Sequence, residues 1–277
     1  MVKGGSVSKA PLPFAFGLLA FALAIVVLGW GAMFMAGFLS RGLGLRLGLM
    51  ASELALPLPA LLAVAALRGT WSEGLGLRRV SARTVGLSLV AGAAFWCGSL
   101  GLFELQYTVW RPPLEYLEAF KRLHEALRPS GPIDALISVA AIAIAPAVFE
   151  ELLFRGVVLP SLLRALGNWG AILGSALLFG MIHLDVSTPG GLFYRVPFAF
   201  AVGIGLGVLR VRTGSLFPSI LAHALLNTIT FVAEPLTEDP GAGLPDPRPL
   251  FGVAMLIPGL VVAALAMKRI DSPRPSP

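Results

Sequence analysis

The amino-acid sequence predicts an all-α membrane protein, a polytopic bundle of about eight transmembrane helices. Of its 277 residues, 56% are hydrophobic and only 13% are charged, and the mean hydropathy is +0.84, which is typical of an integral membrane protein. Runs of about 20 apolar residues, long enough to cross a hydrocarbon layer of ~30 Å, recur along the chain. These runs lack the alternating pattern of barrel strands, so helices are the structure that satisfies their backbone inside lipid.

The predicted spans leave little of the chain for a soluble domain. They cover residues 13–38, 47–67, 84–107, 133–157, 169–186, 195–212, 215–233 and 250–267. The first run follows Lys3 and Lys9 as in a signal peptide, but it is too long and lacks a small-residue cleavage site, so we expect it to remain as an anchor. We therefore treat 1–277 as a single integral membrane domain, in which the Pro-rich residues 271–277 form a disordered tail.

The connection between the third and fourth spans, "RPPLEYLEAFKRLHEALRPSGP", has the pattern of an amphipathic helix. Its apolar residues recur at helical spacing among charged ones: Leu114, Leu117, Phe120, Leu123 and Leu127. Prolines precede it and the Pro-Ser-Gly-Pro run ends it, so we expect this helix to lie along the membrane surface. His124, among charged neighbours, is predicted to be a solvated surface residue.

The basic residues indicate topology and exclude a nucleic-acid partner. The net charge is +6 and the pI about 10.1, but the basic residues are scattered among short connections and form no single patch. If both termini are cytoplasmic, that side receives 13 of the 21 Lys and Arg residues. Both ends are therefore predicted to be cytoplasmic, and the acidic connection "EPLTEDPGAGLPDP" lies on the other side.

Two further features are interpreted as helix packing. Cys97 is the only cysteine, so no internal disulfide and no thiolate zinc cluster can form. Gly170 with Gly174, and Gly203 with Gly207, stand at the four-residue spacing that lets helices approach closely in lipid. No internal repeat is visible, and the sequence carries no signal for an oligomeric state.

Ionisable side chains inside the predicted spans are few, and at that depth the default interpretation is functional. The fourth span holds a pair of carboxylates and an arginine, the fifth a histidine, and the seventh a histidine with an asparagine: Glu150, Glu151, Arg155, His183, His223 and Asn227. The alternative is that the first three form an ordinary charged border at the cytoplasmic end of the fourth span.

The spacing within the fourth span separates two roles. Glu151 and Arg155 are one helical turn apart and share a face, which is the placement of an ion pair, whereas Glu150 points elsewhere. Two adjacent carboxylates in a poorly hydrated site do not both ionise readily, and an arginine that satisfies one leaves the other to be tuned by its surroundings. We therefore expect Glu150 to be a general base and Glu151 to be a supporting group oriented by Arg155.

The two histidines each have a partner one turn away on the same face: Phe179 before His183, and Asn227 after His223. At 1.5 Å per residue from the presumed cytoplasmic ends, Glu150 would lie ~10 Å deep, His223 ~12 Å and His183 ~20 Å. These three side chains therefore meet only if the fifth span starts later or tilts.

Side chains of these types can hydrolyse a peptide bond. A carboxylate and an imidazole, Glu150 and His183, can deprotonate a water molecule, while His223 and Asn227 donate hydrogen bonds to the oxyanion that forms. Glu150, His183 and His223 are also a potential zinc ligand set, although the chain has no H-E-x-x-H motif. There is no G-x-S-x-G turn, no histidine in the span of Cys97 or a neighbouring span, and no phosphate loop, so other nucleophilic and nucleotide chemistries lack support.

These motifs resemble the CPBP intramembrane proteases, the family of the type II CAAX prenyl endopeptidases and of bacteriocin-processing and immunity (ABI) proteins. "EELLFR", "FGMIH" and "HALLN" match E-E-x-x-x-R, F-x-x-x-H and H-x-x-x-N in the family's order, within about residues 135–230. The resemblance implies an eight-helix bundle with a cavity in the membrane, and hydrolysis by Glu150, His183, His223 and Asn227. It favours water activation without a metal cofactor, with zinc as the alternative.

The Ala, Gly, Leu and Arg-rich composition and the compact loops are typical of a prokaryote, so we expect location in the cytoplasmic membrane and a peptide or membrane-protein substrate without a prenyl group. Two other functions remain open. One is a catalytically silent scaffold or immunity protein of the same fold. The other is a proton-coupled transporter, which the missing repeat disfavours.

Overall fold

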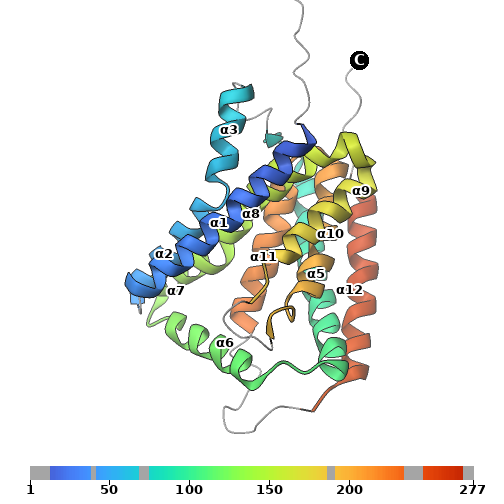
Figure 1. Ribbon diagram of the computed structural model, residues 1–277. Helices are drawn as coiled ribbons and strands as arrows, with labels where there is room; N and C mark the ends of the chain where they lie inside the picture. Colours follow the sequence, from blue (N-terminus) through green and yellow to red (C-terminus); the bar gives the residue numbers. More distant parts are fainter. Residues whose placement is uncertain (1–12, 39–41, 69–74, 186–190, 234–245, 271–277) are drawn as a thin grey trace, which may run out of the picture.

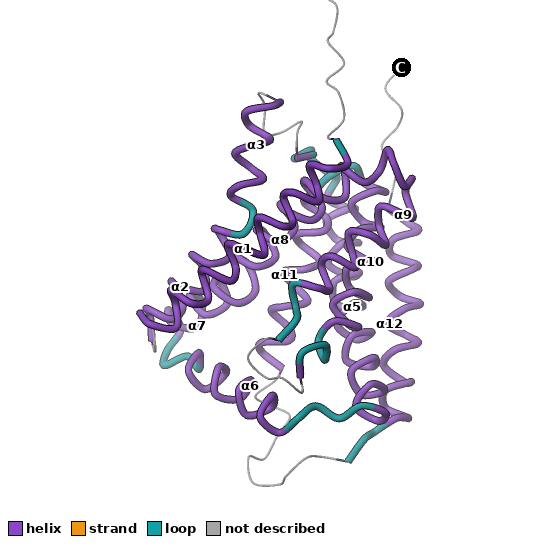
Figure 2. Tube along the Cα trace, viewed as in Figure 1, coloured by secondary structure: helices purple, strands orange, loops and turns teal. Residues whose placement is uncertain are grey.

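A computed structural model of the protein describes residues 13–38, 42–68, 75–185, 191–233 and 246–270. Every regular element within these ranges is a helix, and the helices pack side by side as a bundle (Figures 1 and 2). The prediction of an all-α membrane bundle is therefore confirmed. The predicted disordered tail, 271–277, lies outside the described residues.

Four helical stretches of the described chain are long and apolar enough to cross a membrane: Ala82–Val109, Pro132–Met181, Val196–Thr213 and Pro249–Arg269. They are α5, the run from α7 to α9, α10 and α12. The first helix, α1 (Phe14–Phe38), and α11 (Phe217–Ala233) coincide with two further predicted spans, and the 17 residues of α11 form a shorter apolar helix. The predicted number of eight spans is not confirmed.

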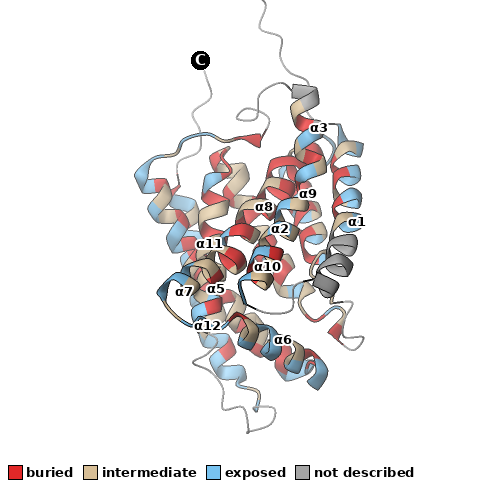
Figure 3. Cartoon of the chain, turned by 90° about the vertical axis from the view of Figure 1, so that its left-hand side faces the viewer, coloured by how far each residue is buried: buried red, intermediate tan, exposed pale blue. Residues whose placement is uncertain are grey.

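The outer surface of the bundle is apolar, as a lipid-facing surface must be. Figure 3 shows the buried residues where helices meet and the exposed ones on the outward faces. Large apolar side chains are exposed along α12, where Leu260 is 60% and Val261 51% exposed, and polar groups such as Arg155 are fully buried. Apolar side chains thus face outward while a charged side chain is buried, which is the reverse of the arrangement in a soluble protein.

One predicted span, 47–67, is not a single helix, so that prediction is wrong. The structure divides it into α2 (Gly42–Ala55) and α3 (Leu58–Arg68). The break falls at Leu56 and Pro57. Proline lacks a backbone N–H and disfavours helical geometry in the residue before it, so the apolar run cannot continue as one straight helix.

The amphipathic helix is present as α6 (Leu114–Leu127), at the end of the bundle opposite to the start of α1 and the end of α12 (Figure 1). His124 is half-buried on it, with its ring centroid 4.8 Å from that of Phe120 and 5.9 Å from that of Phe231 on α11. The prediction of a solvated histidine is therefore wrong. The face that carries Phe120 and His124, one turn apart, packs against the bundle.

The segment from Pro132 to Met181 is one nearly continuous helical run with two widened turns. It consists of α7 (Pro132–Val139), the π-helical turn η1 (Ala140–Ile144), α8 (Ala145–Leu153), the π-helical turn η2 (Phe154–Val158) and α9 (Leu159–Met181). π-Helical turns are rare and are found frequently at functional sites. Here they flank α8, which carries both carboxylates of the E-E-x-x-x-R motif.

The run reverses direction at Gly167, inside α9. Gly167 has φ 66° and ψ −178°, a conformation that is essentially restricted to glycine. Beyond it the chain packs back along the preceding helix: Ser175 Oγ donates to the carbonyl oxygen of Phe154 at 3.2 Å, and a Cβ at Gly174 would lie 3.1 Å from Leu162 Cδ1. The fourth span therefore ends nine residues later than the predicted limit at residue 157.

This reversal removes the mismatch in predicted depth. Glu150 lies 17 residues before Gly167 and His183 lies 16 residues after it. At 1.5 Å per residue the two side chains are about 25 Å and about 24 Å from the turn, and so at the same level of the bundle.

Two helix pairs approach closely through glycine. A Cβ at Gly203 of α10 would lie 3.1 Å from Ala176 Cα of α9, and a Cβ at Gly259 of α12 would lie 2.5 Å from the backbone nitrogen of Gly98 on α5. The predicted role of Gly203 as a bundle contact is confirmed. The first of these contacts positions the backbone of α10 against the functional site.

Candidate functional site

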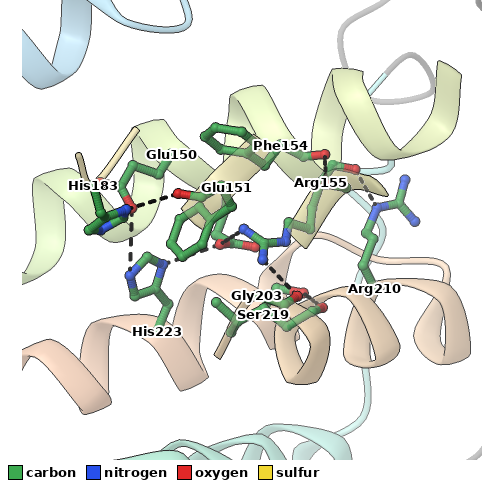
Figure 4. A network of polar contacts seen from close by, with 12 residues as sticks. Glu150, Glu151, Phe154, Arg155, His183, Gly203, Arg210, Ser219 and His223 are labelled. Carbon is green, nitrogen blue, oxygen red and sulfur yellow. Dashed lines mark hydrogen bonds and ion pairs between the residues drawn. The ribbon is translucent and has the colours of Figure 1, made fainter. Parts of the chain in front are cut away.

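Two adjacent carboxylates of α8 are buried and diverge. Glu150 is 7% exposed and Glu151 is fully buried. Successive residues of a helix point about 100° apart, so the two side chains leave α8 in different directions. In Figure 4 Glu151 faces Arg155, whereas Glu150 lies with the rings of His183 and His223.

Glu151 and Arg155 form the ion pair that their spacing predicts. Arg155 donates from one terminal nitrogen to Glu151 Oε1 at 2.8 Å and from the other to the carbonyl oxygen of Gly203 at 2.9 Å. Its guanidinium carbon lies 4.6 Å from the ring centroid of Phe179. Both members of the pair are fully buried, so the charge of Arg155 is balanced inside the bundle.

His223 of α11 lies between the two carboxylates. Its Nδ1 is 3.2 Å from Glu151 Oε1, and its Nε2 is 3.7 Å from Glu150 Oε2. An ionised carboxylate oxygen only accepts hydrogen bonds. The contact with Glu151 Oε1 therefore places a proton on Nδ1 of His223. The opposite ring nitrogen, Nε2, therefore faces Glu150.

His183 follows α9 and is oriented by the backbone one turn earlier. Its Nδ1 is 2.9 Å from the carbonyl oxygen of Phe179. A carbonyl oxygen only accepts, so this hydrogen bond places the proton of the neutral imidazole on Nδ1 and leaves Nε2 as a base. The side chain of Phe179 packs against both imidazoles, with ring centroids 4.9 Å from His183 and 5.7 Å from His223.

The structure thus brings together six of the seven predicted site residues: Glu150, Glu151, Arg155, Phe179, His183 and His223. The seventh, Asn227, lies one turn beyond His223 on α11 and is half-buried. Among the contacts of the described residues none joins Asn227 to the network.

Two charged residues outside the predicted set lie on helices that pack against the site. Arg210 of α10 donates from Nε to the carbonyl oxygen of Arg155 at 3.1 Å. Glu53 of α2 has a buried carboxyl oxygen. A glutamate within the apolar run 47–67 was the sequence signal that could have identified it.

The potential zinc ligands do not gather as a ligand set. Among the described residues no three His, Cys, Asp or Glu side chains are placed to hold a metal ion. The two ring nitrogens of His223 face carboxylate oxygens, and Nδ1 of His183 faces a carbonyl oxygen. We therefore derive no step through a metal.

Fold and site together define a membrane-embedded helical bundle with a buried network of carboxylates, arginine and imidazoles, a set of groups suited to acid–base chemistry. Residues 132–229 match the family model of the type II CAAX prenyl endopeptidases, described as Rce1-like. The predicted resemblance to the CPBP intramembrane proteases is confirmed over this segment, which contains all three motifs. No curated protein and no solved structure matches the chain.

Proposed function

We propose that the protein is an intramembrane endopeptidase in which Glu150 activates water. The observation that carries this proposal is the placement of Glu150: its carboxylate is buried, it lies 3.7 Å from His223 Nε2, and Oε2 has no hydrogen-bond partner among the described residues. A buried carboxylate oxygen without a partner in the protein is suited to accept a hydrogen bond from a reactant.

In the proposed reaction, Glu150 and His183 Nε2 polarise a water molecule whose oxygen bonds to the scissile carbonyl carbon. The proton released by the water passes to Glu150 and then to the amide nitrogen as the carbon–nitrogen bond breaks. The products are a carboxylic acid and an amine, and Glu150 returns to its starting state. Glu151 and Arg155 act indirectly, because their ion pair fixes the position of α8 and of His223.

His223 is suited to stabilise the negative oxygen of the tetrahedral intermediate. Its Nδ1 is held by Glu151, and an imidazole that carries a proton on both nitrogens donates from both. Nε2–H can then donate to the oxyanion, and Asn227 supplies a second donor from the next turn of α11. The helix spacing H-x-x-x-N thus presents both donors on one face.

We infer that the substrate is a peptide or a membrane protein without a prenyl group, cut in the cytoplasmic membrane of a prokaryote. Both termini would be cytoplasmic, and the start of α1 and the end of α12 lie at the same end of the bundle (Figure 1). The network of Glu150, His183 and His223 lies among membrane-spanning helices, which supports a cleavage site within or close to the bilayer.

The deciding experiment replaces Glu150 by Gln in the full-length protein. We expect cleavage of a reporter peptide to be lost while expression and helical content are unchanged, because the isosteric amide cannot take a proton from water. Glu118→Gln, at a side chain that is 53% exposed on α6, is the matched control and should retain full activity. Full activity of Glu150→Gln would contradict the proposed catalysis and favour a silent scaffold or immunity protein.

Metal dependence is tested separately. We expect activity to survive prolonged treatment with a chelator, because the described His and Glu side chains do not gather as a ligand set. Loss of activity that added zinc restores would contradict this expectation.

A further inference from the structure

A third glutamate, Glu53, lies on α2, a helix that packs against the helix of Glu150. α2 packs against η1 and α8, and it runs along the same side of the bundle as α7 and α8 (Figure 1). Arg46 Nε donates to Ser138 Oγ at 2.7 Å, which fixes one point of the register between the two segments. Further along, Leu56 belongs to the same core cluster as Leu153.

Both glutamates precede a leucine of this core cluster. Glu53 is three residues before Leu56 and Glu150 is three residues before Leu153, so each lies nearly one turn before its leucine. Since α2 packs against α8, the two glutamates lie on neighbouring helices, each before a leucine of the shared cluster.

Both glutamates have a buried oxygen without a hydrogen-bond partner among the described residues, Oε2 in each case. Buried carboxylate oxygens are normally satisfied by the protein or by bound water. Two such oxygens on adjacent helices therefore define a polar position between α2 and α8 that a small hydrogen-bond donor can satisfy.

Two carboxyl groups on neighbouring helices repel each other when both are ionised, so placing them close together is costly. Burying a carboxyl group in an apolar segment costs free energy. Packing alone therefore does not explain why Glu53 stands in α2.

We propose that Glu53 is a further residue of the active site, which holds the attacking water molecule together with Glu150. This role rests on the proposed endopeptidase function. A water molecule has two hydrogens: Glu150 accepts and removes one, while Glu53 accepts a hydrogen bond from the other and so directs an oxygen lone pair toward the scissile carbonyl carbon. The second hydrogen stays on the new carboxylic acid. Glu53 therefore makes and breaks no covalent bond and is a positioning residue.

The test uses full-length protein in lipid nanodiscs and a fluorogenic peptide that ends in a CAAX-type sequence, in farnesylated and unmodified forms. Glu53→Leu removes the acceptor, and we expect kcat to fall about 10²-fold with little change in KM, because a misplaced reactant costs that much in rate. Glu53→Gln keeps an acceptor oxygen and should retain most of kcat. Glu118→Leu on the exposed face of α6 is the control and should change neither constant.

The outcomes separate the two proposals. Wild-type kcat in Glu53→Leu, with Glu150→Gln inactive, overturns the role of Glu53 alone. Equal losses in Glu53→Gln and Glu53→Leu, or a loss confined to KM, overturn it as well. Full activity of Glu150→Gln overturns the endopeptidase function and with it this role. If Glu53→Leu does not fold, Glu53→Met removes the carboxyl oxygens at similar length and takes its place.

Discussion

Arg155 shows how a single residue organises the network. Its side chain is fully buried, and it connects three helices: it pairs with Glu151 of α8, donates to the carbonyl oxygen of Gly203 on α10, and lies against the ring of Phe179 on α9. Glu151 in turn holds Nδ1 of His223 on α11. The orientation of His223 therefore depends on Arg155, although the two side chains belong to different parts of the chain.

Replacing Arg155 by Met tests this dependence. Removing one partner of a buried ion pair leaves the other charge uncompensated, and we expect the free energy of unfolding to fall by about 3–5 kcal/mol. The measurement is an unfolding titration with a denaturing detergent. Arg122→Met removes an ion pair whose arginine side chain is 66% exposed, and should change stability by less than about 1 kcal/mol. Similar losses in both variants would contradict the stabilising role of Arg155.

At the scale of residues, the sequence predicted those side-chain contacts that helical spacing alone determines. Glu151 and Arg155 are four residues apart on one helix, so their contact follows from local geometry alone. The position of His223 between the two carboxylates depends on how α11 packs against α8, which no local spacing specifies. His124 was misread for the same reason, since its contact with Phe231 is made between distant parts of the chain.

At the scale of elements, the reversal at Gly167 decides whether the site forms. Because the chain turns without a separate loop, α9 returns beside the helix that precedes it, and Phe179 and His183 arrive at the level of α8. The prediction that the fourth span ends near residue 157 was too early. Its continuation to the turn depends on η2 and on backbone angles that sequence periodicity does not reveal.

Gly167→Ala tests the turn. A side chain at φ 66° and ψ −178° is strained by about 1–3 kcal/mol, so we expect a lower thermal stability together with a lower kcat. The control is Gly86→Ala near the start of α5, where a Cβ meets nothing within 4 Å and alanine favours the helix. A Gly167→Ala protein as stable as the Gly86→Ala protein would show that the turn tolerates a side chain.

The division of the predicted span 47–67 could have been read from Pro57, because proline disfavours an uninterrupted helix. The π-helical turns η1 and η2 could not be predicted from the sequence, because the extra residue in such a turn depends on the packing around it. Long apolar helices such as α5 and α12 were predicted within a few residues, because their hydrophobic runs are uninterrupted.

At the scale of the whole molecule, the bundle has two distinct ends. The start of α5 and the end of α12 lie at one end, and α6 lies at the other (Figure 1). The antiparallel contact of α5 with α12 fixes this arrangement, since Gly98 and Gly101 meet Gly259 and Leu256 respectively. Charge bias predicts that the end with the termini is cytoplasmic.

Labelling of single cysteines tests that orientation. In a Cys97→Ser background, Arg79→Cys lies just before α5 and Ser130→Cys lies between α6 and α7, and both positions are exposed. We expect an impermeant maleimide added to intact cells to label Ser130→Cys and to reach Arg79→Cys only after the membrane is opened. The reverse pattern would place both termini outside.

The buried ion pair also has a consequence for how the chain is made. α8 carries Glu150 and Glu151 and the following turn η2 carries Arg155, and a charged residue at the centre of a lone helix opposes partition into lipid by about 2.5–3.5 kcal/mol. The carbonyl group and imidazole that satisfy these charges belong to α10 and α11, which emerge later from the ribosome. We therefore expect α8 to remain in the translocon, or in contact with an insertase, until these later helices arrive and all three leave for the bilayer together.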